Sequence, residues 1–207
     1  MKIIAHRGFW RSESEKNSLE AIKRAIQEGY GFETDFRDYG GKILISHNPP
    51  RGNEITADSV FKMYQQLGSH EPLALNIKAD GLQDMMGDLL KKYGITNYFF
   101  FDMSVCDTVL YVEKKLKTAS RLSEFEKEMP FYKDSSTVWI DYFYSDGPTI
   151  QKVRQTLQDG KIACVVSPEL HKRSYQQMWT QLLPFKEESN LYLCTDRPDK
   201  AKEFFKL

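Results

Sequence analysis

Residues 1–8 read Met-Lys-Ile-Ile-Ala-His-Arg-Gly, and this stretch is the most informative in the chain. The short apolar run Ile3–Ala5 is typical of a buried strand, and it ends directly in His6, Arg7 and Gly8. The strand therefore brings a general acid or base, a fixed cation and a permissive backbone position to one place. We expect that place to be the mouth of a functional site.

Short apolar runs rich in β-branched or aromatic residues recur along the chain, and helix-like sequence separates most of them. The predicted strands are Ile3–Ala5, Gly31–Phe36, Ile43–Ser46, Leu73–Ile77, Tyr98–Phe101, Thr118–Arg121, Val138–Tyr142, Ile162–Val166 and Leu191–Cys194. The predicted helices are 17–29, 56–67, Leu82–Tyr93, Ser104–Lys115, Pro148–Gln158, Ser174–Leu183 and Pro198–Leu207. Asn17 is the expected N-cap of the first helix, and Gly29 is its expected stop.

Strands that alternate with helices indicate a parallel sheet. Tyr39-Gly40-Gly41 predicts a hairpin between the second and third strands, which leaves eight strand–helix units. That number is typical of a closed barrel, so we predict a compact TIM (β/α)8 barrel, of the α/β class, with a single domain over residues 1–207. An open, doubly wound sheet is the alternative.

Charge and apolar content narrow the class of partner and the location. The chain has 29 basic and 29 acidic residues, without a basic run, which argues against a nucleic-acid or anionic membrane surface. No apolar run approaches the length of a signal peptide or a membrane helix, so we expect no membrane insertion. The three cysteines have no zinc-ligand spacing and suit free thiols in a reducing compartment, for which the cytoplasm is the expected location.

Polar residues stand at or just past the ends of many predicted strands. They are His6, Asp35, His47, Lys78, Asp102, Asp141 and Asp196. In a closed barrel the C-terminal ends of the strands converge on one face, where catalysis takes place, whereas an open sheet would spread them along an edge. The number of these residues favours the barrel.

Glu33 and Asp35 are two positions apart on a predicted strand, so their side chains point to the same face. Two carboxylates held that close need a counter-charge, and a divalent cation with oxygen ligands supplies it. Pairing with Arg7, Arg37 or Lys78 is the alternative.

His6 and His47 end separate strands, and together they can serve as a general base and a general acid. Arg7 offers a planar fork suited to a phosphate group, and Lys78 offers a second cation. Gly8 allows a ligand to approach the backbone closely. With the carboxylate pair, these residues indicate metal-assisted phosphoester chemistry.

Several ordered motifs resemble the signature of the glycerophosphodiester phosphodiesterase family. They are His6-Arg7-Gly8, Asn17-Ser18 with Ala21 and Ala25, Gly29, Glu33-x-Asp35, His47 and, near the end, Cys194-Thr195-Asp196-Arg197-Pro198-Asp199. The resemblance implies a TIM barrel that hydrolyses a phosphodiester to an alcohol and a phosphomonoester, with an adjacent substrate hydroxyl as a candidate first nucleophile. The roles it implies are acid/base catalysis by His6 and His47, binding of Mg²⁺ or Ca²⁺ by Glu33 and Asp35, and phosphate binding by Arg7 and Lys78.

The chain also departs from the family pattern at two acidic positions. Asn48 stands where the family has an aspartate after the histidine, and Asn76 stands where it has a third metal carboxylate. An amide oxygen can ligate a hard cation but adds no charge, so we expect Glu33, Asp35 and Asn76 to hold the metal weakly. Asp102 and Asp141 are candidates to replace the missing carboxylate, or else to cap the helices that follow them.

The segment 166–173 replaces the Trp-Thr-x-Asn signature that the family carries on its seventh strand. We weigh two interpretations of it: a pocket wall in which His171, Lys172 and Arg173 reach an anionic substrate, or a solvated turn before the next helix.

Two alternatives to the metal-dependent hydrolase also stay open. One is a diverged, weakly active or inactive barrel that binds a sugar or polyol phosphate, and the other is a metal-independent enzyme that forms a cyclic phosphate.

Overall fold

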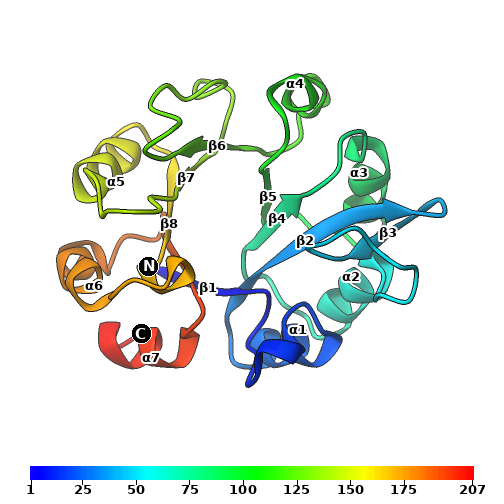
Figure 1. Cartoon of the computed structure of the whole chain (residues 1–207), viewed down its shortest axis with the longest axis horizontal. Helices are drawn as coiled ribbons and strands as arrows, with labels where there is room; N and C mark the ends of the chain where they lie inside the picture. The colour runs from blue at the N-terminus through cyan, green and yellow to red at the C-terminus, as the bar shows by residue number, and fades with distance from the viewer.

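Parallel strands form the inner wall of the computed structural model, which describes residues 1–207, and helices cover its outside (Figure 1). The strands are β1 (Lys2–His6), β2 (Gly31–Tyr39), β3 (Lys42–Ile45), β4 (Leu73–Ile77), β5 (Tyr98–Phe101), β6 (Ala119–Leu122), β7 (Thr137–Ile140), β8 (Ile162–Val166) and β9 (Leu191–Thr195). The α-helices are α1 (Leu19–Gln27), α2 (Ala57–Gln66), α3 (Gln83–Lys92), α4 (Val105–Glu113), α5 (Thr149–Gln158), α6 (Gln176–Leu182) and α7 (Pro198–Phe205).

The strand order is β5-β4-β2-β1-β9-β8-β7-β6, and every pair along this path is parallel. The two end strands meet through one isolated bridge between Phe100 and Thr118, where the Phe100 amide donates to the Lys117 carbonyl at 2.8 Å. This contact nearly closes the sheet, so the predicted barrel is confirmed and the open sheet is wrong. The predicted hairpin is also confirmed, because β3 pairs antiparallel with β2 outside the barrel path.

One predicted helix cap and the predicted number of strand–helix units need correction. Ser18, rather than Asn17, caps α1, and its side chain accepts from the Ala21 amide at 3.1 Å. Asn17 instead adopts a left-handed backbone conformation with φ 62° and turns its side chain toward β2. The fifth strand–helix unit, which begins with β6, has no α-helix, because residues 123–136 between β6 and β7 form turns and loops. Seven helices, rather than one for each of eight units, therefore surround the eight-stranded barrel.

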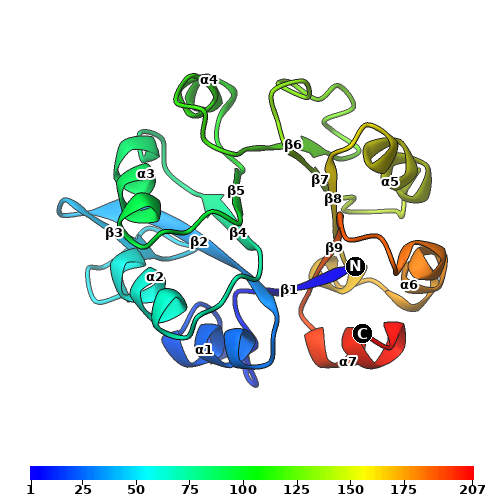
Figure 2. The ribbon, with the colours of Figure 1, turned by 180° about the vertical axis from the view of Figure 1, so that it is seen from behind.

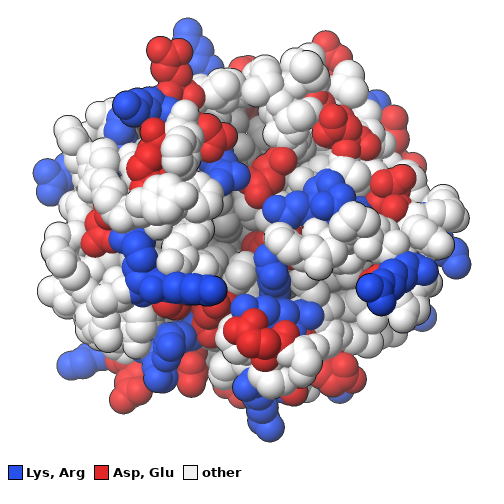
Figure 3. Space-filling model, in the orientation of Figure 1, with Lys and Arg blue, Asp and Glu red and all other residues white.

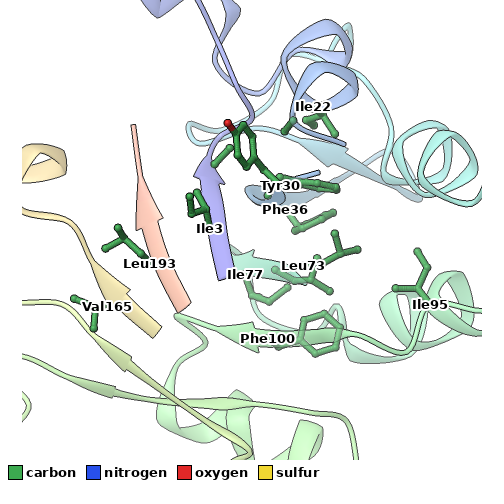
Figure 4. Packing of buried hydrophobic residues seen from close by; sticks show 14 of the residues in the cluster. Ile3, Ile22, Tyr30, Phe36, Leu73, Ile77, Ile95, Phe100, Val165 and Leu193 are labelled. Carbon is green, nitrogen blue, oxygen red and sulfur yellow. The ribbon is translucent and has the colours of Figure 1, made fainter. Parts of the chain in front are cut away.

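Two apolar clusters hold the barrel together. The larger lies between the strands and the helices and includes Ile22, Phe36, Leu73 and Phe100, which Figure 4 shows packed around β1, β2 and β4. The smaller fills the barrel interior and consists of Ile4, Ala74, Phe99, Phe101, Ala119, Trp139, Cys164, Val166, Tyr192 and Cys194. Burial of such side chains contributes roughly 1.5–3 kcal/mol each. The interior below the mouth is therefore packed solid, as expected for a TIM barrel.

The view from behind shows the opposite end of the barrel, where the N-terminus lies near α7 (Figure 2). Cys164 and Cys194 are buried in the interior, Cys106 is exposed on α4, and none forms a disulfide. No helix has the length and apolar character needed to span a membrane.

Gly8 follows β1 and packs against the start of α1. Its φ is +85°, and a Cβ atom there would lie 2.7 Å from the Ala21 carbonyl carbon and 2.8 Å from the Ile22 amide nitrogen. Arg7 has a left-handed φ of 57°, so two successive residues turn the chain sharply at the strand end. Gly8 therefore permits a close approach of the backbone to α1, and the approach of a ligand to this position stays a prediction.

Replacement of Gly8 by alanine should destabilise the fold more than the same change at Gly29. Both glycines have left-handed φ, which costs a side chain roughly 1–2 kcal/mol, but Gly29 has no atom within 4 Å of a built Cβ. The backbone clash at Gly8 should add about 1–3 kcal/mol. Urea unfolding of the two variants measures the difference, and equal losses would show that the contact with α1 does not constrain this turn.

Candidate active site

Polar side chains replace the apolar interior at the C-terminal end of the strands. Alternation along β1 places His6 on the same face as Ile4, which belongs to the barrel interior. His6 pairs in register with Glu33 of β2, and Asp35 pairs with Asn76 of β4. Four of the predicted site residues therefore stand side by side on three adjacent strands. The space-filling view shows a hollow at the centre of this face with charged side chains around it (Figure 3).

His6 is oriented by a carboxylate from the last strand. Its Nδ1 lies 2.6 Å from Asp196 Oδ1, which leaves Nε2 directed to the mouth, 3.8 Å from Glu33 Oε2. Burial opposes ionisation of Asp196, but the hydrogen bond and charge of His6 outweigh it and lower the pKa of Asp196. A carboxylate on Nδ1 holds the imidazole in one orientation, which makes Nε2 the atom suited to acid/base work.

Asp35 is fully buried and surrounded by donors. Arg7 Nε lies 3.1 Å from Oδ2, and Asn17 Nδ2 donates to the same oxygen at 2.8 Å. On the other oxygen, His47 Nδ1 lies at 3.2 Å and Lys78 Nζ at 3.8 Å. Burial raises the pKa of Asp35, but Arg7 and these partners outweigh it, so the pKa stays below its ordinary value. The predicted pairing with Arg7 and Lys78 is thus present, whereas Arg37 contacts the His47 carbonyl instead.

The negative charge of Glu33 is less well compensated by nearby donors and cations than that of Asp35. Its Oε2 accepts from the Arg7 backbone amide at 3.2 Å, and its Oε1 accepts from Asn76 Nδ2 at 3.1 Å. Burial and the nearby charge of Asp35 raise the pKa of Glu33 to about 7. Near neutral pH this carboxyl group is therefore balanced between its two protonation states, and an added cation would favour the ionised one.

His47 is the most exposed of the predicted catalytic residues, with 47% of its side chain accessible. Arg7 Nη2 lies 2.9 Å from His47 Nδ1, and Asp35 Oδ1 lies 3.2 Å from the same atom. Donation from Arg7 requires a lone pair on Nδ1, whereas a hydrogen bond to Asp35 requires a proton there. The ring can therefore change its partner when its protonation state changes.

The oxygen atoms of Glu33, Asp35 and Asn76 fit a hard cation. Asn76 is 7% exposed, and its Oδ1 is buried without a hydrogen-bond partner, so it is an available neutral oxygen beside two carboxylates. The chain has no group of three His, Cys, Asp or Glu side chains arranged to hold a metal ion. The candidate ligands are thus two carboxylates and one amide oxygen, which carry less negative charge than three carboxylates would.

Neither candidate replacement for the third carboxylate joins this set. Asp102 has a left-handed φ of 65° and accepts from Lys78 at 3.1 Å, and Asp141 contacts His171 at 2.6 Å. The alternative prediction, that both cap the helices after them, is also wrong. Ser104 caps α4, and α5 begins without a side-chain cap.

The segment after β8 differs from both sequence-based interpretations. It forms a short 3-10 helix, η2 (Pro168–His171), whose His171 faces Asp141. Lys172 is exposed, and Arg173 is held by Asp146 at 2.7 Å. The three basic residues therefore do not converge on an anion site.

Asn17 and Asp196 are the supporting residues that sequence reasoning did not assign. Asn17 donates to Asp35 and accepts from Thr34 at 2.7 Å, although its position before a helix indicated a cap. Asp196 was identifiable as a polar strand end, but its pairing with His6 depends on the contact between the first and last strands. Trp10 lies beside them and donates to the His6 carbonyl at 3.1 Å.

Three solved structures with a similar fold are phosphodiesterases, and two of them are described as glycerophosphodiester or glycerophosphoryl diester phosphodiesterases. The enzyme from Agrobacterium tumefaciens has a TM-score of 0.71 and 15% identity, over 99% of this chain and 98% of that one. A glycerophosphoryl diester phosphodiesterase from Parabacteroides distasonis has a TM-score of 0.68 and 13% identity, over 99% and 86%. An Oleispira antarctica phosphodiesterase in complex with the product sn-glycerol-3-phosphate has a TM-score of 0.67 and 15% identity, over 100% and 97%.

No protein-family model matches the chain, and no curated protein matches it in sequence. The likeness is therefore one of fold, and it extends over nearly the whole chain.

Stability of the metal-free protein should fall as pH rises from about 4.5 to about 7 because of Glu33. Its pKa in the folded chain lies above the ordinary 4.5, so the folded state holds a proton that the unfolded state has lost. The free energy of unfolding of Glu33→Gln, relative to that of the native protein, should therefore rise by roughly 2–3 kcal/mol between pH 5 and pH 7.5. Denaturant unfolding in EDTA measures this gain, and parallel pH curves for the two proteins would contradict it.

Proposed function

We propose that the chain is a phosphoric diester hydrolase that acts on a small glycerophosphodiester-like substrate. The observation that supports this most is the arrangement around Asp35, where Arg7, His47 and Lys78 all face one buried carboxylate at the barrel mouth. His6 approaches from the neighbouring strand. The pairing of two histidines with two cations suits a reaction that binds a phosphate anion and moves protons on either side of it.

Arg7 and Lys78 bind the phosphate group in this proposal. The Arg7 guanidinium uses Nε toward Asp35 and Nη2 toward His47 and retains other N–H donors for a phosphate oxygen. Lys78 is held between Asp35 and Asp102, which fixes its ammonium group beside the mouth. Cations held in place before the substrate arrives stabilise charge on the phosphoryl oxygens without reorganisation.

His6 and His47 divide the proton transfers. His6 accepts a proton at Nε2 from the attacking hydroxyl, and Asp196 stabilises the resulting imidazolium. His47 supplies a proton to the leaving oxygen, from a position beside the Arg7 guanidinium. Each step is of the kind that contributes roughly 10²–10⁴-fold to the rate.

Glu33, Asp35 and Asn76 would hold the divalent metal, Mg²⁺ or Ca²⁺. When bound there, the ion neutralises the carboxylate pair and polarises a phosphate oxygen. A metal-independent reaction that ends in a cyclic phosphate is the second candidate, because Arg7 and Lys78 already compensate Asp35.

Turnover of a glycerophosphodiester should depend on both histidines. We expect His6→Ala and His47→Ala to lower kcat by at least about 10²-fold, because each removes one proton-transfer group. His70→Ala is the matched control, since His70 precedes β4 at the opposite end of the barrel. Release of alcohol and phosphomonoester is the measurement, and full activity in either variant would contradict its role.

The same assay with EDTA distinguishes the two candidates. Loss of turnover that Mg²⁺, Ca²⁺ or Mn²⁺ restores supports the metal-dependent hydrolase. Persistent turnover with a cyclic phosphate product supports the metal-independent reaction.

Asn76→Glu should tighten metal binding about tenfold or more, because it adds a third carboxylate to the set. Asn190→Glu is the matched control: it makes the same change at an exposed position before β9, at the other end of the barrel. Titration calorimetry with Mn²⁺ measures both variants. Unchanged or weaker binding in Asn76→Glu would remove Asn76 from the proposed metal ligands.

A further inference from the structure

The half of the mouth that faces the proposed phosphate site carries its own polar cluster. Arg121 follows Ala119 by two positions on β6, and Asp141 follows Trp139 by two positions at the end of β7. Ala119 and Trp139 belong to the barrel interior, so alternation turns Arg121 and Asp141 inward above them. His171 reaches the same point from η2. We call Arg121, Asp141 and His171 the distal cluster.

The distal cluster is tightly connected within itself. His171 Nε2 lies 2.6 Å from Asp141 Oδ1, and Arg121 Nη2 lies 3.4 Å from Asp141 Oδ2. Asp141 is 7% exposed, so its position is fixed by these two partners. Such preorganised donors and acceptors hold their positions before a ligand binds.

The charge around the distal cluster argues against a second anion. Arg121 contacts three carboxylates, from Asp102 at 2.8 Å, Glu126 at 3.0 Å and Asp141 at 3.4 Å. No cation there is left uncompensated, and the carboxylates outnumber Arg121. A neutral group that both donates and accepts hydrogen bonds matches this set better than a phosphate or carboxylate does.

Aromatic side chains form the wall beside the distal cluster. The Phe143 ring lies 4.5 Å from the His171 ring and 5.3 Å from the Arg121 guanidinium. Phe125 and Tyr144, which are 72% and 79% exposed, pack beside Phe143. Apolar rings next to paired donors and acceptors suit a ligand with both C–H faces and hydroxyl groups.

One carboxylate holds this wall in place. Glu124 accepts from the backbone amides of Phe143, Tyr144 and Ser145 at 2.8–3.2 Å. The loop after β6 is thereby tied to the loop after β7, although neither forms a helix at this point. The exposed rings are therefore presented by a fixed surface.

Asp102 joins the distal cluster to the proposed phosphate site. It accepts from Lys78 at 3.1 Å with one oxygen and from Arg121 at 2.8 Å with the other. Only the Asp102 carboxylate thus separates the distal cluster from Lys78, which is proposed to bind the phosphate. A group bonded to the phosphate would lie within its reach.

We infer that the distal cluster binds a polyhydroxylated alcohol group of the diester, a sugar ring, through hydroxyl contacts to Arg121, Asp141 and His171. This inference rests on the proposed diester hydrolysis and specifies one alcohol of its substrate. The carboxylate of Asp141 accepts from hydroxyl groups, Arg121 and His171 donate to them, and the aromatic wall packs against the carbon skeleton.

Matched chromogenic diesters test the inference. p-Nitrophenyl phosphodiesters of ethanol and of a hexose share the reacting phosphate and differ in hydroxyl groups. We expect kcat/KM for the hexose diester to exceed that for the ethyl diester at least tenfold in the native protein. His171→Ala and the nearly isosteric Asp141→Asn should each lower this ratio roughly threefold to tenfold, the effect of one hydrogen bond.

Lys172→Gly is the control for the distal variants, because Lys172 is exposed beside His171 and its left-handed φ of 59° suits glycine. It should leave the ratio unchanged. A native ratio near one, or a ratio that neither His171→Ala nor Asp141→Asn lowers, would overturn the inference.

Equilibrium binding separates this inference from the proposed function. If no diester is hydrolysed, the proposed function fails, and calorimetry with a hexose phosphate and with ethyl phosphate still tests the distal cluster. Tighter binding of the hexose phosphate that Asp141→Asn weakens supports the inference. Equal affinities for the two phosphates overturn it.

Discussion

Two buried carboxylates on one strand impose the constraint on which the mouth of this barrel depends. Glu33 and Asp35 are 1% and 0% exposed and point to the same side of β2. Burial of an unpaired charge is costly, so the surrounding strands must provide compensation. Arg7 from the end of β1, Asn17 from the loop before α1 and Lys78 from the end of β4 all turn toward Asp35 for this reason. The polar mouth is organised around that compensation.

The strand pattern was predictable because each strand carries a local signal. Short β-branched and aromatic runs mark all nine strands, and because charge on a buried strand is costly, charged residues on or directly after such a run stand out as candidates for a site. The polar ends of β1, β2 and β4 therefore indicated the site. Pairings across the barrel were not predictable in this way. The contact of His6 with Asp196 joins residues at opposite ends of the chain, and the choice of Ser18 over Asn17 as the helix cap depends on the need of Asp35 for a donor.

Asn76 illustrates how one neutral side chain changes the balance of the site. It pairs in register with Asp35 and donates to Glu33, so it relieves part of the repulsion that a carboxylate would increase. Its unpartnered oxygen also offers a ligand of low charge. A site of this composition can stay folded without an ion, whereas three buried carboxylates would depend on one.

The charged residues at the mouth also connect β5 with β6, the two neighbouring strands that share the fewest backbone hydrogen bonds. Other neighbouring strands share several register pairs, but these two share one isolated bridge. Asp102 follows β5 and Arg121 lies on β6, so their ion pair connects the two strands at the mouth of the barrel. Local opening of a protein starts where backbone hydrogen bonds are fewest. We therefore expect local opening of the barrel wall to start between β5 and β6, where the ion pair of Asp102 and Arg121 supplements the single backbone bridge.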